Sequence, residues 1–353
     1  MPVSVASSVV GLVRGGVFAA LLPVLGGCYL LQAAGGQMAV MARRQPVEAV
    51  LRDPQTPPQL RTRLAEVSAA RDFASQSLGL PDNGSYRQYA DIGRNYVVWN
   101  VFATPPFSVE PRRWCFPVAG CVVYRGYFAE RRAQAYAGRL RRRGDDVAVG
   151  GVTAYSTLGH FADPILSTML PYSDAQLAGT IFHELAHQLI YIQDDSAFNE
   201  AFASTVEEVG VMRWLERSGR QRDLEAWQRQ RRRAEDFSRL LLGARDQLRG
   251  LYAQALPPVD MNHRKQQILG RLKFSYERQR DEWGGYPGYD AWFARTLTNA
   301  DLVATATYRR CIPGFKRILA ASGDDLAEFY RRVRELARET PAARQRLLCG
   351  ESE

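Results

Sequence analysis

Apart from its first 27 residues, the sequence has no long apolar run, and it contains no internal repeat and no low-complexity tract. These absences exclude a multi-span membrane protein, a collagen-like chain and an intrinsically disordered one. What remains is ordinary for a globular protein, because 46% of the 353 residues are hydrophobic and 24% are charged. A chain of this length can bury a substantial core in one large domain or in two lobes.

Lysine is also scarce. Only three of the 46 basic residues are lysines (Lys265, Lys273 and Lys316), and the net charge is +9. A large excess of arginine is compatible with nucleic acid or anionic lipid as a partner. The arginines are spread along helical stretches and interleaved with Glu and Asp, which favours solvated helix faces instead. The sequence therefore predicts no nucleic-acid partner.

The N-terminal segment determines the predicted compartment. Residues 1–27 contain one basic residue, Arg14, and an apolar run at 15–25 that is too short and too glycine-interrupted to span a bilayer, as in a signal peptide. The Leu-Gly-Gly-Cys sequence that ends at Cys28 resembles the bacterial lipoprotein box, whose cysteine is lipidated after cleavage of the signal peptide. The alternative is a plain core cysteine. Because Tyr29 rather than Asp follows, the resemblance implies an outer-membrane lipid anchor facing the periplasm.

Four further cysteines would lie in an oxidising compartment, where disulfides persist. Cys115 and Cys121 bound the sequence Cys-Phe-Pro-Val-Ala-Gly-Cys, in which proline and glycine allow the chain to turn back, so we predict a small disulfide loop. Cys311 and Cys349 are the leftover pair, and the sequence leaves open whether they meet. No Cys-x-x-Cys spacing occurs, which disfavours a zinc knuckle.

Hydrophobic periodicity predicts strands early in the chain and helices late. Residues 36–80 have helical period, broken by a proline-rich turn. The further predictions are strands at 96–103 and 121–124, a helix at 129–143, extended segments at 146–151 and 152–157, and helices from 174 onward. This order favours a mostly helical α+β fold. We divide it into a signal peptide (1–27), an N-terminal lobe with a small sheet (28–173) and a helical lobe (174–353).

The sequence His183-Glu184-Leu185-Ala186-His187 is an HExxH motif. On a helix, histidines four residues apart project from one face and can bind one Zn²⁺ ion, with the glutamate as general base. A single histidine on such a helix would more often be a core residue. Two of only four histidines at ligand spacing, with a glutamate between them, favour a metal site.

Catalytic zinc takes three protein ligands and keeps one position open. A metzincin would place a third histidine six residues after His187, but that position is Gln193. Glu200 lies on a predicted second helix capped by Asp195 or Ser196. The twelve residues between His187 and Glu200 are enough to end one helix, turn and begin an antiparallel partner.

These motifs resemble those of the gluzincins of the aminopeptidase N family, HELAHQ and NEGFAS, which read here HELAHQ at 183–188 and NEAFAS at 199–204. The whole chain more closely resembles the bacterial putative-aminopeptidase lipoproteins. Those proteins share the lipoprotein box, the Cys-Phe-Pro-Val-Ala-Gly-Cys segment and the Ala-Tyr-Ser-Thr-Leu-Gly stretch at 154–159. The resemblance implies a two-lobed, gluzincin-like zinc peptidase acting on peptides.

The resemblance also assigns roles to single residues. His183, His187 and Glu200 would hold zinc, and Glu184 would take a proton from zinc-bound water and pass it to the leaving amine. The oxyanion needs a donor, which related gluzincins supply as a tyrosine or histidine of the second lobe. Tyr308 is the first candidate. The alternatives are Tyr286 and Tyr289 in a glycine-rich loop.

Substrate contacts follow less directly. Gluzincins hold the peptide along an edge strand before the metal helix, a place that residues 151–159 occupy here, although an ordinary sheet strand fits equally. The GxMEN segment that binds the substrate's free amine has no counterpart. A buried ammonium group needs a carboxylate, so Glu207, two turns beyond Glu200, is the first candidate and Asp163 the second. Asp194 and Asp195 could orient ligands or cap a helix.

Two other functions remain open. An envelope quality-control endopeptidase would carry an aspartate four residues after its glutamate ligand, in the pattern Glu-x-x-x-Asp. Here the fourth residue after Glu200 is Ser204. A non-catalytic lipoprotein could bind peptides or hold zinc structurally. Glu184 argues against this, since a structural zinc site does not need that carboxylate.

Overall fold

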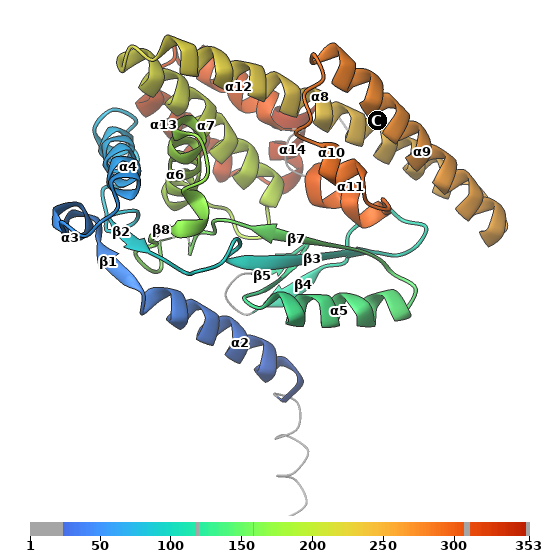
Figure 1. Ribbon diagram of the computed structural model, residues 1–353. Helices are drawn as coiled ribbons and strands as arrows, with labels where there is room; N and C mark the ends of the chain where they lie inside the picture. Colours follow the sequence, from blue (N-terminus) through green and yellow to red (C-terminus); the bar gives the residue numbers. More distant parts are fainter. Residues whose placement is uncertain (1–23, 117–119, 158, 307–310, 351–353) are drawn as a thin grey trace, which may run out of the picture.

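The computed structural model describes residues 24–116, 120–157, 159–306 and 311–350 (Figure 1). Short strands and helices alternate before the η1 turn (Ser167–Met169): α2 (Val24–Met41), β1 (Arg44–Pro46), α3 (Val47–Arg52), α4 (Pro58–Gln76), β2 (Gln88–Ala90), β3 (Val98–Thr104), β4 (Trp114–Phe116), β5 (Gly120–Val122), β6 (Arg125–Tyr127), α5 (Glu130–Arg142), β7 (Asp146–Val152) and β8 (Ile165–Leu166). The remaining elements are helices: α6 (Asp174–Leu189), α7 (Ser196–Arg217), α8 (Gln221–Tyr252), α9 (Pro258–Glu282), α10 (Asp290–Phe293), α11 (Asn299–Ala306), α12 (Ile312–Ala321), α13 (Leu326–Ala337) and α14 (Pro341–Cys349). The predicted mostly helical α+β class is confirmed.

The described strands form three small sheets. β3 pairs antiparallel with β6 on one side and with β7 on the other, from Val98 opposite Val152 to Thr104 opposite Asp146. β2 pairs antiparallel with β1 and parallel with β8. β4 and β5 form a hairpin. β7 is thus an edge strand, and it ends at Val152, so the extended segment predicted at 152–157 lies almost wholly beyond it. Buried Asp163 binds that segment instead and keeps it irregular.

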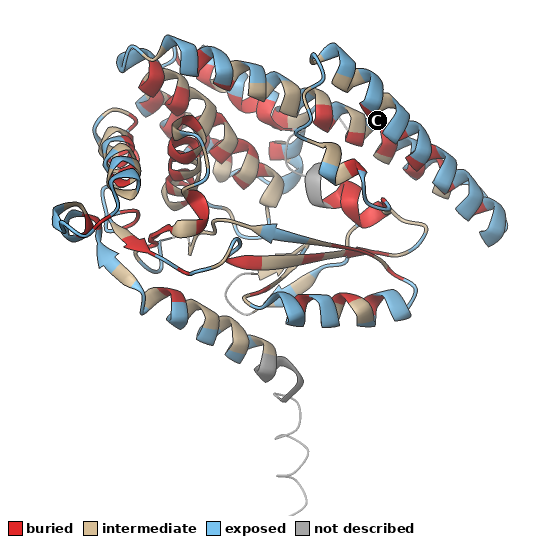
Figure 2. Cartoon of the chain, viewed as in Figure 1, coloured by how far each residue is buried: buried red, intermediate tan, exposed pale blue. Residues whose placement is uncertain are grey.

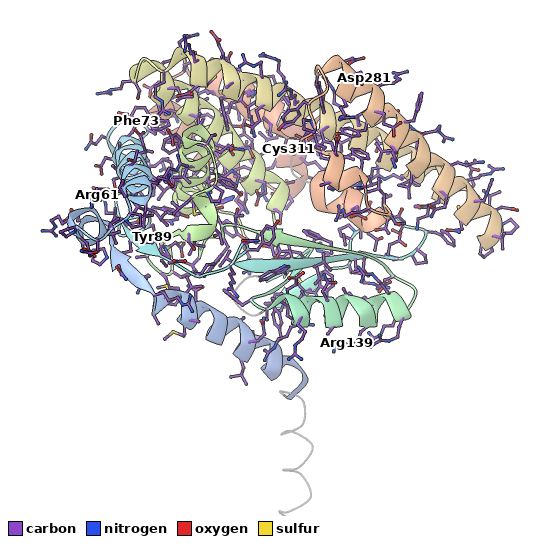
Figure 3. The ribbon with its side chains drawn as sticks, in the orientation of Figure 1. Arg61, Phe73, Tyr89, Arg139, Asp281 and Cys311 are labelled. Atoms are coloured by element: carbon purple, nitrogen blue, oxygen red, sulfur yellow. A yellow bond between two sulfur atoms is a disulfide. The ribbon has the colours of Figure 1, made fainter. Side chains whose placement is uncertain are left out.

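Two disulfides join parts of this framework. Cys115 and Cys121 face each other across the β4–β5 hairpin and are bonded. Cys311 and Cys349, whose pairing the sequence left open, link the start of α12 to the end of α14. Figure 3 labels Cys311 within the helical part of the molecule.

The largest buried cluster is built from elements far apart in sequence. It joins residues of α3 and α4 to α6, α7 and α12–α14, so residues from both sides of position 174 share it. Within it, Phe202 of α7 lies 5.9 Å, between ring centroids, from Phe315 of α12 and from Phe329 of α13. Buried positions gather on the facing sides of these helices (Figure 2). α7 is therefore fixed along its inner face.

The β6–β3–β7 sheet carries helices on two sides. α5 packs against β3 and β7 through buried Ala133, Ala137 and Leu140, while α11 also packs on β3 and β7. In Figure 1 α5 lies below the sheet and α11 above it. None of the helices in the described part of the chain is long and apolar enough to cross a membrane. The predicted signal peptide falls mainly in residues 1–23, which lie outside the described residues.

Candidate metal centre

α6 carries the HExxH motif and begins at a complete capping box. Ser173 accepts the Gln176 amide hydrogen at 3.2 Å, and the Gln176 side chain accepts that of Ser173 at 3.0 Å. The apolar positions Leu177, Ile181 and Leu185 are buried in the core. Because the histidines occupy another face, His183 and His187 project toward α7.

The turn between α6 and α7 is held by the side chain of Asn199. Its Oδ1 accepts the backbone N–H of Ile192 at 2.8 Å, and its Nδ2 donates to the Ile192 carbonyl at 2.7 Å. Asp195 caps α7 by accepting the Phe198 amide and forms an ion pair with Arg344 at 2.7 Å. These contacts fix the register at which Glu200 faces the two histidines.

The three side chains converge on one point. The Nε2 atoms of His183 and His187 lie 3.2 Å apart. Glu200 places Oε2 at 3.3 Å from the first and Oε1 at 3.7 Å from the second. One ligand atom from each residue lies within 4.8 Å of the others. A tetrahedral ion with bonds of about 2.0–2.2 Å sets its ligand atoms roughly 3.3–3.6 Å apart, so these residues fit a single metal ion.

A further carboxylate lies behind the first histidine. Glu207 Oε2 is 3.1 Å from His183 Nδ1, on the side of the ring away from Glu200. Gly179, one turn before His183, makes room for this contact, because a Cβ there would lie 3.2 Å from Glu207 Cγ. Arg231 of α8 lies 3.6 Å from the other Glu207 oxygen. Such an outer carboxylate fixes the ring orientation and leaves Nε2 for a metal.

The charges of the cluster are strongly coupled. Burial alone would lower the pKa of His183, but hydrogen bonds to Glu200 and Glu207 hold that pKa well above its usual value. Burial and the neighbouring His183 lower the pKa of His187 to about 4. Burial would raise the pKa of Glu200, yet the two histidines bring it below its usual value. A metal cation in the cluster would take the place of the proton on His183, and with it of the positive charge of that side chain.

Glu184 adds a carboxylate beside the cluster that is not one of its ligands. Burial raises the pKa of Glu184 to about 7, against the opposing effect of His183. A carboxyl group with a pKa near neutrality can both accept and release a proton at physiological pH. The site thus combines three residues that could hold a metal ion with a carboxyl group that could accept a proton, the arrangement that the HExxH motif predicts.

The family model described as "Putative aminopeptidase" matches residues 28–348. The chain belongs to this family. The chain matches no curated protein and no solved structure. Membership in a family of aminopeptidases implies a peptide substrate and explains the pairing of the His-His-Glu cluster with Glu184.

In this family member, three tyrosines that the sequence analysis missed lie near the cluster. Burial and the charge of Glu184 hold the pKa of Tyr86 well above its usual value. Desolvation, with the charges of Glu200 and Glu184, raises the pKa of Tyr124 to about 12. The ring of Tyr191 meets that of His187 edge-on at 6.4 Å between centroids. Only Tyr191, four residues after His187 and just beyond the end of α6, lies close to the motif in sequence.

The segment that places Tyr86 is tied to the HELAHQ motif. Gln188 Oε1 accepts a hydrogen bond from Asn83 Nδ2 at 2.7 Å, and Gln188 Nε2 donates one to the Ser85 hydroxyl at 3.3 Å. Tyr86 itself is buried with φ of 61°, in the left-handed region, and its amide donates to the Asp163 carbonyl at 2.6 Å. Its buried hydroxyl has no partner among the described residues. Because Gln188 and Glu184 are one turn apart, this loop covers the α6 face that carries Glu184.

The described candidates for the oxyanion donor and for orienting the ligands contact other parts of the molecule. Tyr308 lies outside the described residues. Tyr289 stacks on Phe237 at 4.0 Å between ring centroids, and Tyr286 packs near it in the α8–α10 cluster. Asp194 accepts the Cys121 amide at 2.8 Å and so joins the disulfide hairpin to the α6–α7 turn.

The two candidate amine ligands are both engaged within the protein. Glu207 contacts His183, as described above. Asp163 is buried and accepts hydrogen bonds from the amide of Thr157 at 2.8 Å and from its hydroxyl at 2.9 Å. Burial raises the pKa of Asp163. Its contacts organise the segment between β7 and β8.

Proposed function

We propose that the protein is a zinc-dependent metallopeptidase that acts as an aminopeptidase on periplasmic peptides. The convergence of His183, His187 and Glu200 beside Glu184 carries this proposal. Two imidazoles and one carboxylate form a catalytic zinc ligand set that leaves a fourth position for substrate. We also propose a two-lobed, gluzincin-like cleft between the small sheets and the helical region.

When bound, zinc would supply a Lewis acid that polarises the scissile carbonyl. The chain's own residues supply the remaining steps. Glu184 accepts a proton from the attacking water and delivers it to the leaving amine. Tyr124, whose pKa the charges of Glu200 and Glu184 help to raise, is a described candidate to donate a hydrogen bond to the developing oxyanion. Tyr308 remains the candidate from the sequence.

A peptide pair tests the aminopeptidase proposal. The purified zinc-loaded protein is expected to cleave the first bond of a peptide with a free N-terminus and to leave its N-acetylated counterpart intact. Liquid chromatography with mass spectrometry identifies the bond that is cut. Equal cleavage of both peptides would make the protein an endopeptidase, and cleavage of neither would favour a non-catalytic peptide-binding lipoprotein.

We assign Glu207 to orienting His183 rather than to binding the substrate amine. Removing a carboxylate that orients a metal-binding histidine costs about 10–100-fold in metal affinity or activity. Glu207→Gln is therefore expected to weaken zinc affinity by that factor and to lower kcat/KM, as measured by competition with a chromophoric chelator and by kinetics.

The matched control is Glu208→Gln. Glu208 is the next residue of α7. It pairs with Lys316 at 2.7 Å and shares Arg231 with Glu207, at 3.2 Å, but it forms no ion pair with either histidine. That variant is expected to retain zinc affinity. If Glu207→Gln instead keeps full zinc affinity and raises KM for peptides with a free amine, Glu207 is the amine ligand and our assignment is wrong.

We propose that Cys28 attaches the mature chain to the outer membrane, facing the periplasm. The Leu-Gly-Gly-Cys sequence supports this proposal. Cys28→Ala is expected to abolish incorporation of labelled fatty acid when the full chain is expressed in a bacterium. Fractionation would then no longer find the processed chain in the outer membrane. Labelling of the variant at the wild-type level would refute the assignment.

A further inference from the structure

α5 presents a row of arginines to solvent. Its inner face packs on the β6–β3–β7 sheet, and its outer face is exposed (Figure 2). Six exposed arginines lie on α5 or directly after it: Arg131, Arg132, Arg139, Arg141, Arg142 and Arg143. Glu130, at its first turn, is the one acidic residue of the helix. None of these six guanidinium groups forms an ion pair with a described carboxylate.

Some arginines on other helices are neutralised by carboxylates of the same helix, whereas others, such as Arg271 of α9, form no ion pair with a described carboxylate either. Arg331 of α13, for example, pairs with Glu328 at 2.6 Å and with Glu335 at 2.5 Å. Two carboxylates just beyond α5 are committed elsewhere, because Asp145 binds Arg112 at 2.6 Å and Asp146 binds Lys265 at 2.5 Å. The interleaved pattern predicted from the sequence therefore holds for α13 but not for α5. An uncompensated row of this kind attracts anions.

A groove of about 800 Å³ between α5 and α2 extends the positive charge. Arg125 lies in it, with its guanidinium carbon 4.1 Å from the centroid of the Tyr29 ring and 4.7 Å from that of Tyr136. Arg132 and Arg139 line the same groove. Figure 3 labels Arg139 on the lower side of α5. The groove thus combines cationic groups with aromatic walls.

The exposed part of α2 beside this groove is apolar. Leu31 is 73% exposed and Leu30 is 48% exposed, and both follow the proposed lipidation position Cys28 within two or three residues. Figure 1 shows α2 and α5 together at the lower side of the molecule. Exposed leucines next to a basic surface are typical of a segment that lies in a membrane interface.

We propose that α5 and the exposed Leu30 and Leu31 of α2 form a membrane-contact surface whose arginines bind the phosphate groups of anionic phospholipids. The proposal rests on the proposed anchor at Cys28 for the orientation of the surface, but the charge and the exposed leucines stand without it. α11 and the helical region lie on the other side of the sheet in Figure 1, so this contact holds the helical region away from the bilayer.

The test measures the ratio of protein bound to anionic vesicles to protein bound to neutral vesicles. The full chain is mixed with equal amounts of phosphatidylcholine vesicles and vesicles of equal parts phosphatidylcholine and phosphatidylglycerol, which are then separated. The acyl chains of a lipid attached at Cys28 would insert equally into both kinds of vesicle. The ratio therefore reports the contact with the lipid headgroups. Each basic side chain near an anionic surface strengthens binding roughly fivefold. The variant R131Q/R132Q/R139Q is therefore expected to lose on the order of 100-fold of the preference for phosphatidylglycerol.

The matched control is R264Q/R271Q/R278Q, which removes three exposed arginines from α9, at the far side of the molecule. It is expected to keep the wild-type ratio, and raised salt is expected to reduce that ratio. A wild-type ratio near one, or an equal loss in both variants, would overturn the proposal. Displacement from phosphatidylglycerol by duplex DNA would assign the surface to nucleic acid instead. A preference that persists in Cys28→Ala would separate this surface from the anchor.

Discussion

Glu184→Gln is expected to lower kcat for peptide hydrolysis by about 100-fold to 10,000-fold, the range for loss of a general acid–base group. The substitution keeps the size and hydrogen-bonding capacity of the side chain but removes its ability to carry a proton. Glu184 is not among the three residues that converge on the metal position. Zinc content and substrate KM are therefore expected to remain near the wild-type values, so that the loss falls on kcat.

Glu208→Gln serves as the control, because it makes the same chemical change on a neighbouring helix and away from the cluster. Steady-state kinetics and zinc analysis on both variants give the comparison. Hydrolysis by Glu184→Gln at a rate within tenfold of the wild type would rule out the proton-transfer role that we assign to Glu184.

His187→Ala is expected to remove zinc from the protein and, with it, all measurable peptidase activity. His187 is buried, and its Nε2 lies 3.2 Å from that of His183, so no other described side chain can take its place. With only His183 and Glu200 left, the site falls below the three protein ligands of a catalytic zinc site. Elemental analysis after dialysis against trace zinc measures the loss.

The control for this substitution is His263→Ala. His263 is exposed on α9 and contacts only Gln267 in the described structure, at 2.9 Å. Both variants are checked by circular dichroism, since a histidine in the core could also destabilise α6. A folded His187→Ala protein that binds zinc as tightly as the His263→Ala protein would contradict the assignment of the ligand.

The convergence of His183, His187 and Glu200 was predictable because the signals that define it are local. The spacing of His183 and His187 follows from the helical period alone. Glu200 required one further step, the count of residues needed to turn between two helices. The structure supplies the reason that the turn works, since Asn199 clamps the Ile192 backbone. Asn199 carries no signal of that role in the sequence.

The surroundings of the site were not predictable, because long-range packing creates them. Tyr86 lies almost a hundred residues before Glu184, and its loop is joined to α6 by long-range contacts such as those of Gln188 with Asn83 and Ser85. Glu207 was correctly placed near the cluster by helical spacing. Its contact with His183 rather than with substrate depends on Gly179, which lets α7 approach α6 closely.

X-ray absorption at the zinc K-edge of the full-length protein tests the central claim most directly. The account predicts one zinc per chain with a first shell of nitrogen and oxygen only, at about 2.0–2.2 Å, including imidazole scattering from two histidines. The outer-shell signal of one imidazole should disappear in any zinc retained by His187→Ala. A chain that binds no zinc, or a shell with sulfur at about 2.3 Å, would contradict the account.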